Sequence, residues 1–311
     1  PLDMSSISNF TPLTPGGFTG TFNGLGNTIS NLVINNSGAD SVGLFGQVST
    51  GGTIRNVGLI QANVTDYGEA TGSLAGVNDG TISNVYATGN VTDKGDNKGI
   101  SNTASSNSGN AAGGLIGVNE GTISDAYVTE NVTQNSILGG HATVGGLVGL
   151  NYYGTISNVY ATGNMRSTSY NGETGGLVGY NYYGTISNAY ATGNVTGSAL
   201  SEVGGLVGYN SGSISNAYAT GNVTGSYGNA GGLVGYNYYG TISDVYATGN
   251  MTGNYLPGAL ICVNYGTLNN AYFDTSTSGT TVGIRAGNMS GGKGLTTVQW
   301  LTEGPMVSGS P

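Results

Sequence analysis

The order of hydrophobic and polar positions repeats along most of the chain. The most regular stretch reads Gly-Thr-Ile-Ser-Asn-(Val/Ala)-Tyr-Ala-Thr-Gly-Asn-Val-Thr. Its clear copies start at Gly80, Gly121, Gly154, Gly184, Gly212 and Gly240, and weaker ones start at Gly52 and Gly266. Alternation of apolar and polar residues is typical of β-strands, whose successive side chains point to opposite faces. The pattern therefore predicts a short strand at every copy.

A second element, Gly-Gly-Leu-Val-Gly, precedes the first in each unit. Its leucines are Leu44, Leu74, Leu115, Leu147, Leu177, Leu206, Leu233 and Leu260. The unit is too short to bury a core of its own, so neighbouring units must stack. The extra lengths, residues 93–112 and 134–143, fall in one phase of the repeat, as expected for loops on one side of a stack.

Stacked units of this kind pair strand on strand, in parallel, at about 4.8 Å per unit. The sequence therefore predicts an all-β fold, a right-handed parallel β-helix (β-solenoid) of about 8–9 coils with terminal caps. We expect an N-terminal lead-in or cap over residues 1–35, a repeat solenoid over 36–272 and a C-terminal closing segment or cap over 273–311. Thr296 or Thr297 is expected to cap a short helix before Trp300.

The alternation also predicts which side chains face the interior. In the unit that starts at Gly184, Ile186 and the two alanines at 189 and 191 should point inward, and Asn188 should turn a corner. Tyr190 and Thr192 should then point outward. The opposite arrangement, with the tyrosines inside, stays open from the sequence alone.

Composition and charge exclude several classes of protein. Glycine makes up 60 of the 311 residues, and the net charge is −9 with only six scattered basic residues. Nucleic-acid binding needs a basic patch, so no nucleic-acid partner is expected. With one Cys and one His, no internal disulfide and no His/Cys zinc site can form, and we expect no metal and no cofactor. No apolar run of transmembrane length exists. The opening at Pro1 suggests a fragment of a longer protein.

The repeated elements resemble the GLUG repeat, which is named for a Gly-Leu-hydrophobic-Gly core. Gly146-Leu147-Val148-Gly149 and Gly205-Leu206-Val207-Gly208 fit that core directly. The family occurs in large bacterial and archaeal surface proteins, including filamentous-haemagglutinin-like adhesins and the non-catalytic regions of immunoglobulin A1 metallopeptidases. The resemblance implies a secreted or cell-surface module. Peptidase chemistry is not implied, because the chain has no His-Glu-x-x-His motif.

Two groups of tyrosines are the candidate ligand-contact residues. The first recurs on the strands and includes Tyr160, Tyr190, Tyr218 and Tyr246. The second lies in three Asn-Tyr-Tyr-Gly turns and consists of Tyr152, Tyr153, Tyr182, Tyr183, Tyr238 and Tyr239. Aromatic residues on turns are hard to explain as core, so the turn group is the stronger candidate for a contact surface.

Asparagine and threonine also recur in rows. Asn recurs at three positions of the repeat, exemplified by Asn181, Asn188 and Asn194, and each row would become a ladder of side-chain amides. A structural role is favoured over a sugar-binding strip. Rows such as Thr192 and Thr196 resemble the surface of ice-binding solenoids, although the bend between the two threonines argues against that function.

The sequence thus predicts a non-catalytic segment of an exported cell-surface protein that acts as an adhesin or a rigid stalk. Its partners would be surface glycans or proteins of a host or neighbouring cell, and partly capped ends would allow end-to-end self-association. A polysaccharide-degrading β-helix enzyme and an ice-binding solenoid are the alternatives. The enzyme would require a groove with two or more acids within one or two coils. Asp79 and Glu120 are aligned acids, but nothing else around them suggests catalysis.

Overall fold

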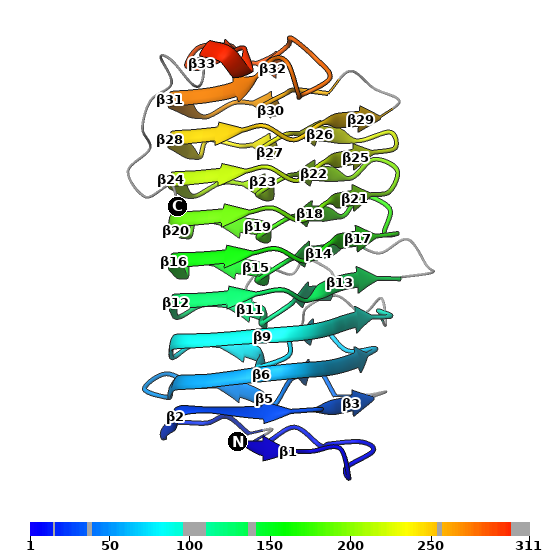
Figure 1. Cartoon of the computed structure of the whole chain (residues 1–311), viewed down its shortest axis with the longest axis vertical. Helices are drawn as coiled ribbons and strands as arrows, with labels where there is room; N and C mark the ends of the chain where they lie inside the picture. Colours follow the sequence, from blue (N-terminus) through cyan, green and yellow to red (C-terminus); the bar gives the residue numbers. More distant parts are fainter. Residues whose placement is uncertain (15, 36–38, 96–109, 136–140, 254–256, 300–311) are drawn as a thin grey trace.

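The computed structural model describes residues 1–14, 16–35, 39–95, 110–135, 141–253 and 257–299. In this part of the chain, short strands wind in stacked coils around one long axis, and the strands of neighbouring coils pair in parallel (Figure 1). The strands of the longest sheet run from left to right across the front of Figure 1, and the chain returns behind them as it climbs, which is a right-handed path. The predicted parallel β-solenoid is therefore confirmed.

Three sheets, here called A, B and C, run along the axis. Sheet A has 17 strands: β1 Leu2–Asp3, β2 Thr21–Ser30, β3 Val33–Asn35, β6 Thr53–Asp66, β9 Thr81–Asp93, β12 Thr122–Val128, β13 Asn131–Gln134, β16 Thr155–Ala161, β17 Met165–Ser167, β20 Thr185–Ala191, β21 Val195–Gly197, β24 Ser213–Ala219, β25 Val223–Gly225, β28 Thr241–Ala247, β29 Met251–Gly253, β31 Thr267–Asp274 and β33 Gly292–Leu295.

Sheets B and C supply the other sides of each coil. Sheet B has nine strands: β5 Phe45–Val48, β8 Ala75–Asn78, β11 Ile116–Asn119, β15 Val148–Tyr152, β19 Val178–Tyr182, β23 Val207–Asn210, β27 Val234–Asn237, β30 Ile261–Asn264 and β32 Ile284–Gly287. Sheet C has seven: β4 Ser41–Val42, β7 Ala70–Thr71, β10 Asn110–Gly113, β14 Ala142–Gly145, β18 Glu173–Gly175, β22 Glu202–Gly204 and β26 Asn229–Gly231.

The interior is a column of Leu, Ile, Val and Ala side chains contributed by every coil. The leucine of each Gly-Leu-hydrophobic-Gly core is buried, and so are Ile186, Ala189 and Ala191 of β20. Tyr190 is partly exposed and Thr192 is exposed. The predicted inward and outward positions are confirmed, and the tyrosines lie on the outside.

The last glycine of the Gly-Leu-hydrophobic-Gly core brings sheet B against sheet C. A Cβ atom added at Gly179 would lie 2.6 Å from the backbone nitrogen of Val144 and 2.7 Å from the carbonyl oxygen of Gly149, both in the preceding coil. No side chain fits there, so only glycine permits this approach. Sheets B and C therefore meet at a tight corner along the solenoid.

Both ends of the chain add to the stack. At the N-terminal end, β1 pairs with β2, which pairs in turn with β6. At the other end, β33 pairs with β31 and is followed by a helical turn over residues 297–299. The Thr296 hydroxyl accepts a hydrogen bond from the Gln299 backbone N–H, and the Gln299 side chain accepts one from the Thr296 N–H. This capping box confirms the predicted N-cap at Thr296. Trp300 and the central parts of both insertions lie outside the described residues.

Candidate functional site

The first Asn/Asp row turns the corner within sheet A. Asn84, Asp125, Asn158, Asn188, Asn216, Asp244 and Asn270 all have positive φ angles between 45° and 56°. Asn and Asp adopt this left-handed conformation more readily than other residues with a side chain, which explains why only these two types occur there. Most of these side chains also donate a hydrogen bond to the preceding coil, as Asn188 Nδ2 does to Asn158 Oδ1 at 3.0 Å. The row has a structural role.

A second Asn row is buried at the corner that joins sheets B and A. Asn78, Asn119, Asn151, Asn181, Asn210, Asn237 and Asn264 have no exposed surface. Each Nδ2 donates to the Oδ1 of the next Asn at 2.7–2.8 Å, without a break along the series. Since both the donor and the acceptor of each amide are used, the ladder ties seven coils together inside the protein. It cannot serve as a sugar-binding strip.

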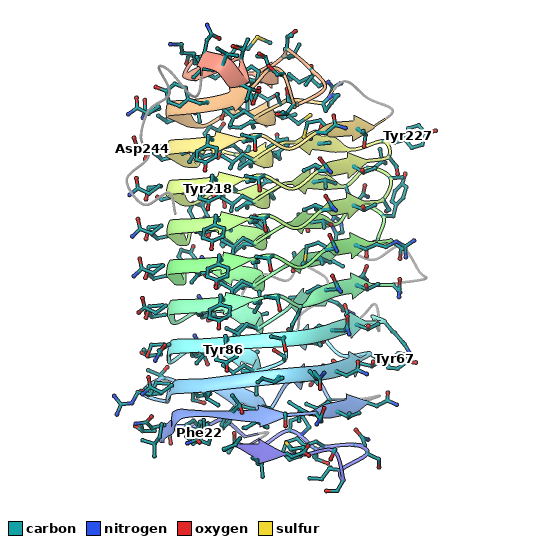
Figure 2. The ribbon with its side chains drawn as sticks, viewed as in Figure 1. Phe22, Tyr67, Tyr86, Tyr218, Tyr227 and Asp244 are labelled. Carbon is teal, nitrogen blue, oxygen red and sulfur yellow. The ribbon has the colours of Figure 1, made fainter. Side chains whose placement is uncertain are left out.

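The strand tyrosines form a stacked column on the outer face of sheet A. Neighbouring rings from Tyr86, Tyr127, Tyr160, Tyr190, Tyr218 and Tyr246 lie 4.7–5.0 Å apart with interplanar angles of 2–6°. Figure 2 shows Tyr86 and Tyr218 in front of the sheet, several coils apart. Because each ring covers the faces of its neighbours, the column presents ring edges and hydroxyls to solvent. Burial raises the pKa of Tyr218 to about 12, so the column is uncharged at neutral pH.

The turn tyrosines form a more exposed cluster. Tyr153, Tyr183 and Tyr239 have exposed fractions of 58%, 56% and 72%. Each has a positive φ angle at the tip of its turn. Their partners Tyr152, Tyr182 and Tyr238 meet them edge to face at 4.4–4.8 Å. The structure thus brings the six predicted turn residues to the surface, in two groups separated by the coil in which Ser211 alone replaces the pair.

A further group of tyrosines, which the sequence analysis missed, lies in the corner between sheets B and C. Tyr180, Tyr209 and Tyr236 are in register on β19, β23 and β27. Tyr209 and Tyr236 stack at 5.0 Å, whereas Tyr180 is tilted by 59° from Tyr209. Opposite them, β18, β22 and β26 place Glu173, Glu202 and Asn229 in register. We call these six residues the upper groove.

The two glutamates of the upper groove both have raised pKa values. Burial raises the pKa of Glu202 to about 7, against a hydrogen bond from Asn229 that lowers it. Burial raises the pKa of Glu173 well above its ordinary value, and the charge of Glu202 adds to that effect. Oε2 of Glu173 is buried and accepts no hydrogen bond among the described residues. The negative charges of the two acids also raise the pKa values of Tyr180, Tyr209 and Tyr236, although burial is the main cause for each.

In the three coils that precede the upper groove, the same corner between sheets B and C is lined mainly by apolar side chains. Val77, Val118 and Leu150 occupy the positions of the three groove tyrosines, and Ala70, Ala111 and Thr143 occupy those of the polar row. Val77, Val118 and Leu150 are buried and form, with Ala70 and Ala111, a hydrophobic cluster distinct from the core. We call these six residues the lower groove.

The other candidate acids, Asp79 and Glu120, form a pair near the surface turn. Asp79 and Glu120 lie near each other on successive coils, and the pKa of Glu120 is raised by burial first and by the charge of Asp79 second. Asp79 accepts a hydrogen bond from Gln47 at 2.7 Å. Among the residues that the structure describes, no group of three or more His, Cys, Asp or Glu side chains is arranged to hold a metal ion. Nor does any helix in this part of the chain have the length and apolarity to cross a bilayer.

The comparisons with known proteins agree with the fold. The GLUG motif matches residues 67–92, 140–165, 170–196, 199–224 and 226–252. These matches confirm the resemblance to the GLUG repeat in five stretches of the chain.

Two relatives place this segment in context. Halomucin from Haloquadratum walsbyi (strain DSM 16790 / HBSQ001) is 48% identical over 91 residues, which is 29% of this chain. The chain spans only 1% of the length of that protein. A crystal structure described as that of a "putative immunoglobulin A1 protease" from Bacteroides ovatus aligns with a TM-score of 0.56 and 28% identity, over 72% of this chain and 68% of that one.

Proposed function

We propose that this GLUG-repeat solenoid is a stiff, non-catalytic segment of an exported cell-surface protein and that it makes adhesive contacts with glycans through its turn tyrosines. The exposure of Tyr153, Tyr183 and Tyr239 carries the proposal, because large aromatic side chains on turn tips contribute little to the core of the fold. The buried Asn ladder supports a stiff rod, since it links each coil to the next through amide hydrogen bonds.

The similarity to halomucin supports a surface location. Halomucin is a far longer polypeptide than this chain, which spans 1% of its length. In such a polypeptide, a rod with repeated weak contacts gains avidity from their number rather than from the strength of each contact.

A glycan-array screen tests the proposal. The wild-type chain is compared with a variant in which Tyr153, Tyr183 and Tyr239 are changed to Ser. The matched control changes Tyr67, Tyr170 and Tyr227 to Ser; these are also exposed tyrosines, with exposed fractions of 38–55%. Figure 2 shows Tyr67 and Tyr227 at the right-hand edge of the solenoid, away from the tyrosine column on sheet A.

We expect glycan signals that fall at least tenfold in the first variant and stay within twofold of wild type in the control. Equal loss in both variants would mean that tyrosine content, not the turn cluster, determines binding. An absence of glycan binding by the folded wild-type chain would leave a spacer role and overturn the adhesive part.

One observation favours a second candidate, a polysaccharide-degrading enzyme. The upper groove places two glutamates on neighbouring coils, which is the arrangement that such an enzyme needs. Release of reducing ends from a panel of polysaccharides, abolished by Glu202→Gln, would establish that activity. The ice-binding alternative requires a flat threonine plane, and thermal-hysteresis measurements on the same chain test it.

A further inference from the structure

The upper groove combines acidic and aromatic walls within three coils. Glu173 and Glu202 are register partners on adjacent parallel strands, which are about 4.8 Å apart in such a sheet. The facing wall is made of Tyr180, Tyr209 and Tyr236. The charge interactions of Glu173 with Tyr180, and of Glu202 with Tyr209 and Tyr236, show that the two walls lie close together.

The two acids are poorly compensated within the groove. Glu202 receives a hydrogen bond from Asn229, but Oε2 of Glu173 is buried without a hydrogen-bond partner among the described residues. Arg285 lies on β32 of sheet B, beside Cys262 of β30, with its Nη1 3.9 Å from the Cys262 Sγ. Removing a carboxylate from water without a partner is unfavourable, so a cation that enters the groove would gain from both acids at once.

The facing wall selects the kind of cation. A calcium ion requires six to eight oxygen ligands, and one wall of this groove consists of tyrosine rings. Aromatic rings instead attract organic ammonium groups, through the negative charge on the ring faces. The tilt of Tyr180 from Tyr209 interrupts the ring stack at the coils that carry the two acids, so these rings do not cover each other as the strand tyrosines do.

The burial of the Glu173 carboxyl group determines which kind of molecule can bring an ammonium group to it. Because Oε2 of Glu173 is buried, a ligand must reach it with a narrow group. A lysine side chain carries a compact ammonium at the end of a flexible, apolar stem, and that stem can pack along ring edges. An amino sugar carries its ammonium directly on a bulky ring. The depth therefore favours lysine.

We infer that the upper groove binds a lysine side chain of a partner protein, with the ammonium between the Glu173 and Glu202 carboxyl groups and the stem along Tyr180, Tyr209 and Tyr236. The inference is independent of glycan binding at the turn tyrosines, because it concerns different residues. The net charge of −9 adds a general attraction for a lysine-rich segment.

Binding should depend on pH. Each acid faces the other acid, and the groups around both are Tyr180, Tyr209, Tyr236 and Asn229. Cys262 lies beside Asn229, and Arg285 lies beside Cys262. Glu202, with a pKa of about 7, titrates near neutrality, whereas burial raises the pKa values of the tyrosines and of Cys262. An ammonium prefers ionised carboxylates, so affinity should rise as the pH increases through about 7, where Glu202 loses its proton.

The test is a calorimetric titration of the full chain with the peptide Lys-Gly-Lys-Gly-Lys, blocked at both ends, in about 0.15 M salt. Its side chains alternate in direction when extended, so the lysines project to one side. We expect at least tenfold weaker binding to the same peptide with acetylated lysines, and about tenfold tighter binding at pH 8 than at pH 6. Glu202→Gln and Glu173→Gln should each lower the affinity at least tenfold.

The control variant is Glu120→Gln, which removes one negative charge outside the groove. Its affinity for the lysine peptide should stay within twofold of wild type. Equal effects of Glu120→Gln and Glu202→Gln would show that binding depends only on the net charge of the protein, and would overturn the inference. Binding of the acetylated peptide, no saturable binding of the lysine peptide, or preferential binding of a glucosamine oligomer would each overturn it as well. Failure of any of these leaves the glycan-array result at the turn tyrosines unaffected.

Discussion

The lower and upper grooves share one backbone and differ in their side chains. In the lower groove, Val77, Val118 and Leu150 close the corner as a buried apolar cluster. In the upper groove, Tyr180, Tyr209 and Tyr236 are partly exposed and face two glutamates. The glycines that bring sheets B and C together are present in the coils of both grooves, here called the lower and upper halves of the solenoid. The comparison teaches that the repeat determines the shape of the corner, whereas one variable position in each coil determines its chemistry.

The largest expected effect is a difference between the two grooves in the free energy of unfolding lost on truncation of one side chain. Changing Leu150 to Ala should cost about 3 kcal/mol, because Leu150 has no exposed surface and its removal leaves a cavity. Changing Tyr236 to Ala, at the equivalent position of the upper groove, should cost only about 1 kcal/mol, the value of a partly exposed aromatic pair. Urea denaturation followed by circular dichroism measures both. Equal losses would remove the distinction between a structural and a solvent-facing corner.

The second prediction tests whether the difference is confined to the outer corner. The buried Asn ladder crosses both halves, so Asn119→Ala and Asn210→Ala should each cost about 2–3 kcal/mol, since each leaves buried amide groups unpaired. Asn194→Ala is the matched control, because Asn194 is exposed and accepts only a backbone N–H of the next coil. A much smaller loss at one ladder position than at the other would show that the halves also differ inside.

The limits of the sequence analysis follow from the same geometry. Alternation correctly assigned Ile186, Ala189, Tyr190 and Ala191, because β20 keeps a period of two on each side of the corner at Asn188. The stacking of the strand tyrosines also follows from the repeat, since equivalent residues of parallel coils lie directly above one another.

The upper groove escaped prediction for two physical reasons. Val178 and Tyr180 pair with the next coil, but Gly179 between them does not, and the alternation breaks there. Val178 consequently joins the core, whereas Tyr180 packs beside the separate outer cluster. Glu173 and Glu202 precede the Gly-Gly element in variable segments, where no period links them. The repeated Tyr after Gly-Leu-Val-Gly in three successive units was the one available signal. The domain boundaries at 35/36 and 272/273 stay predictions.

The third prediction compares a buried acid of each half. Glu130 lies in the interior, in the position that glycine occupies in most other units, and burial raises its pKa well above the ordinary value. A raised pKa means that the folded state holds the proton more tightly than the unfolded chain does. That contribution to stability is complete below about pH 4.5 and is lost as the pH rises through the folded pKa.

Glu130→Gln and Glu202→Gln should therefore stabilise the protein at pH 8 more than at pH 4. For Glu202, whose pKa rises from 4.5 to about 7, the difference should be about 2 kcal/mol, reduced from the full value because part of the side chain is in water. Denaturation of both variants and of Glu120→Gln at the two pH values measures it. A larger stabilisation at pH 4 than at pH 8 would contradict the assigned protonation.

The smallest effect concerns the corner within sheet A, which is the same in both halves. Asn84 and Asn216 have φ angles of 51° and 50°, a conformation that costs a residue with a Cβ about 1 kcal/mol unless it is Asn or Asp. Asn84→Ala and Asn216→Ala should each lower the free energy of unfolding by about 1 kcal/mol, whereas the corresponding Gly variants should lower it by only a few tenths. Differences this small require urea midpoints measured on all four variants together. If Ala and Gly behaved alike, the backbone conformation would not be the reason for Asn at this corner, and the hydrogen bond to the preceding coil would explain it instead. If the Ala variants differed between the two halves, the corner would depend on the groove beyond it, and the two regions could not be treated as one backbone with exchangeable side chains.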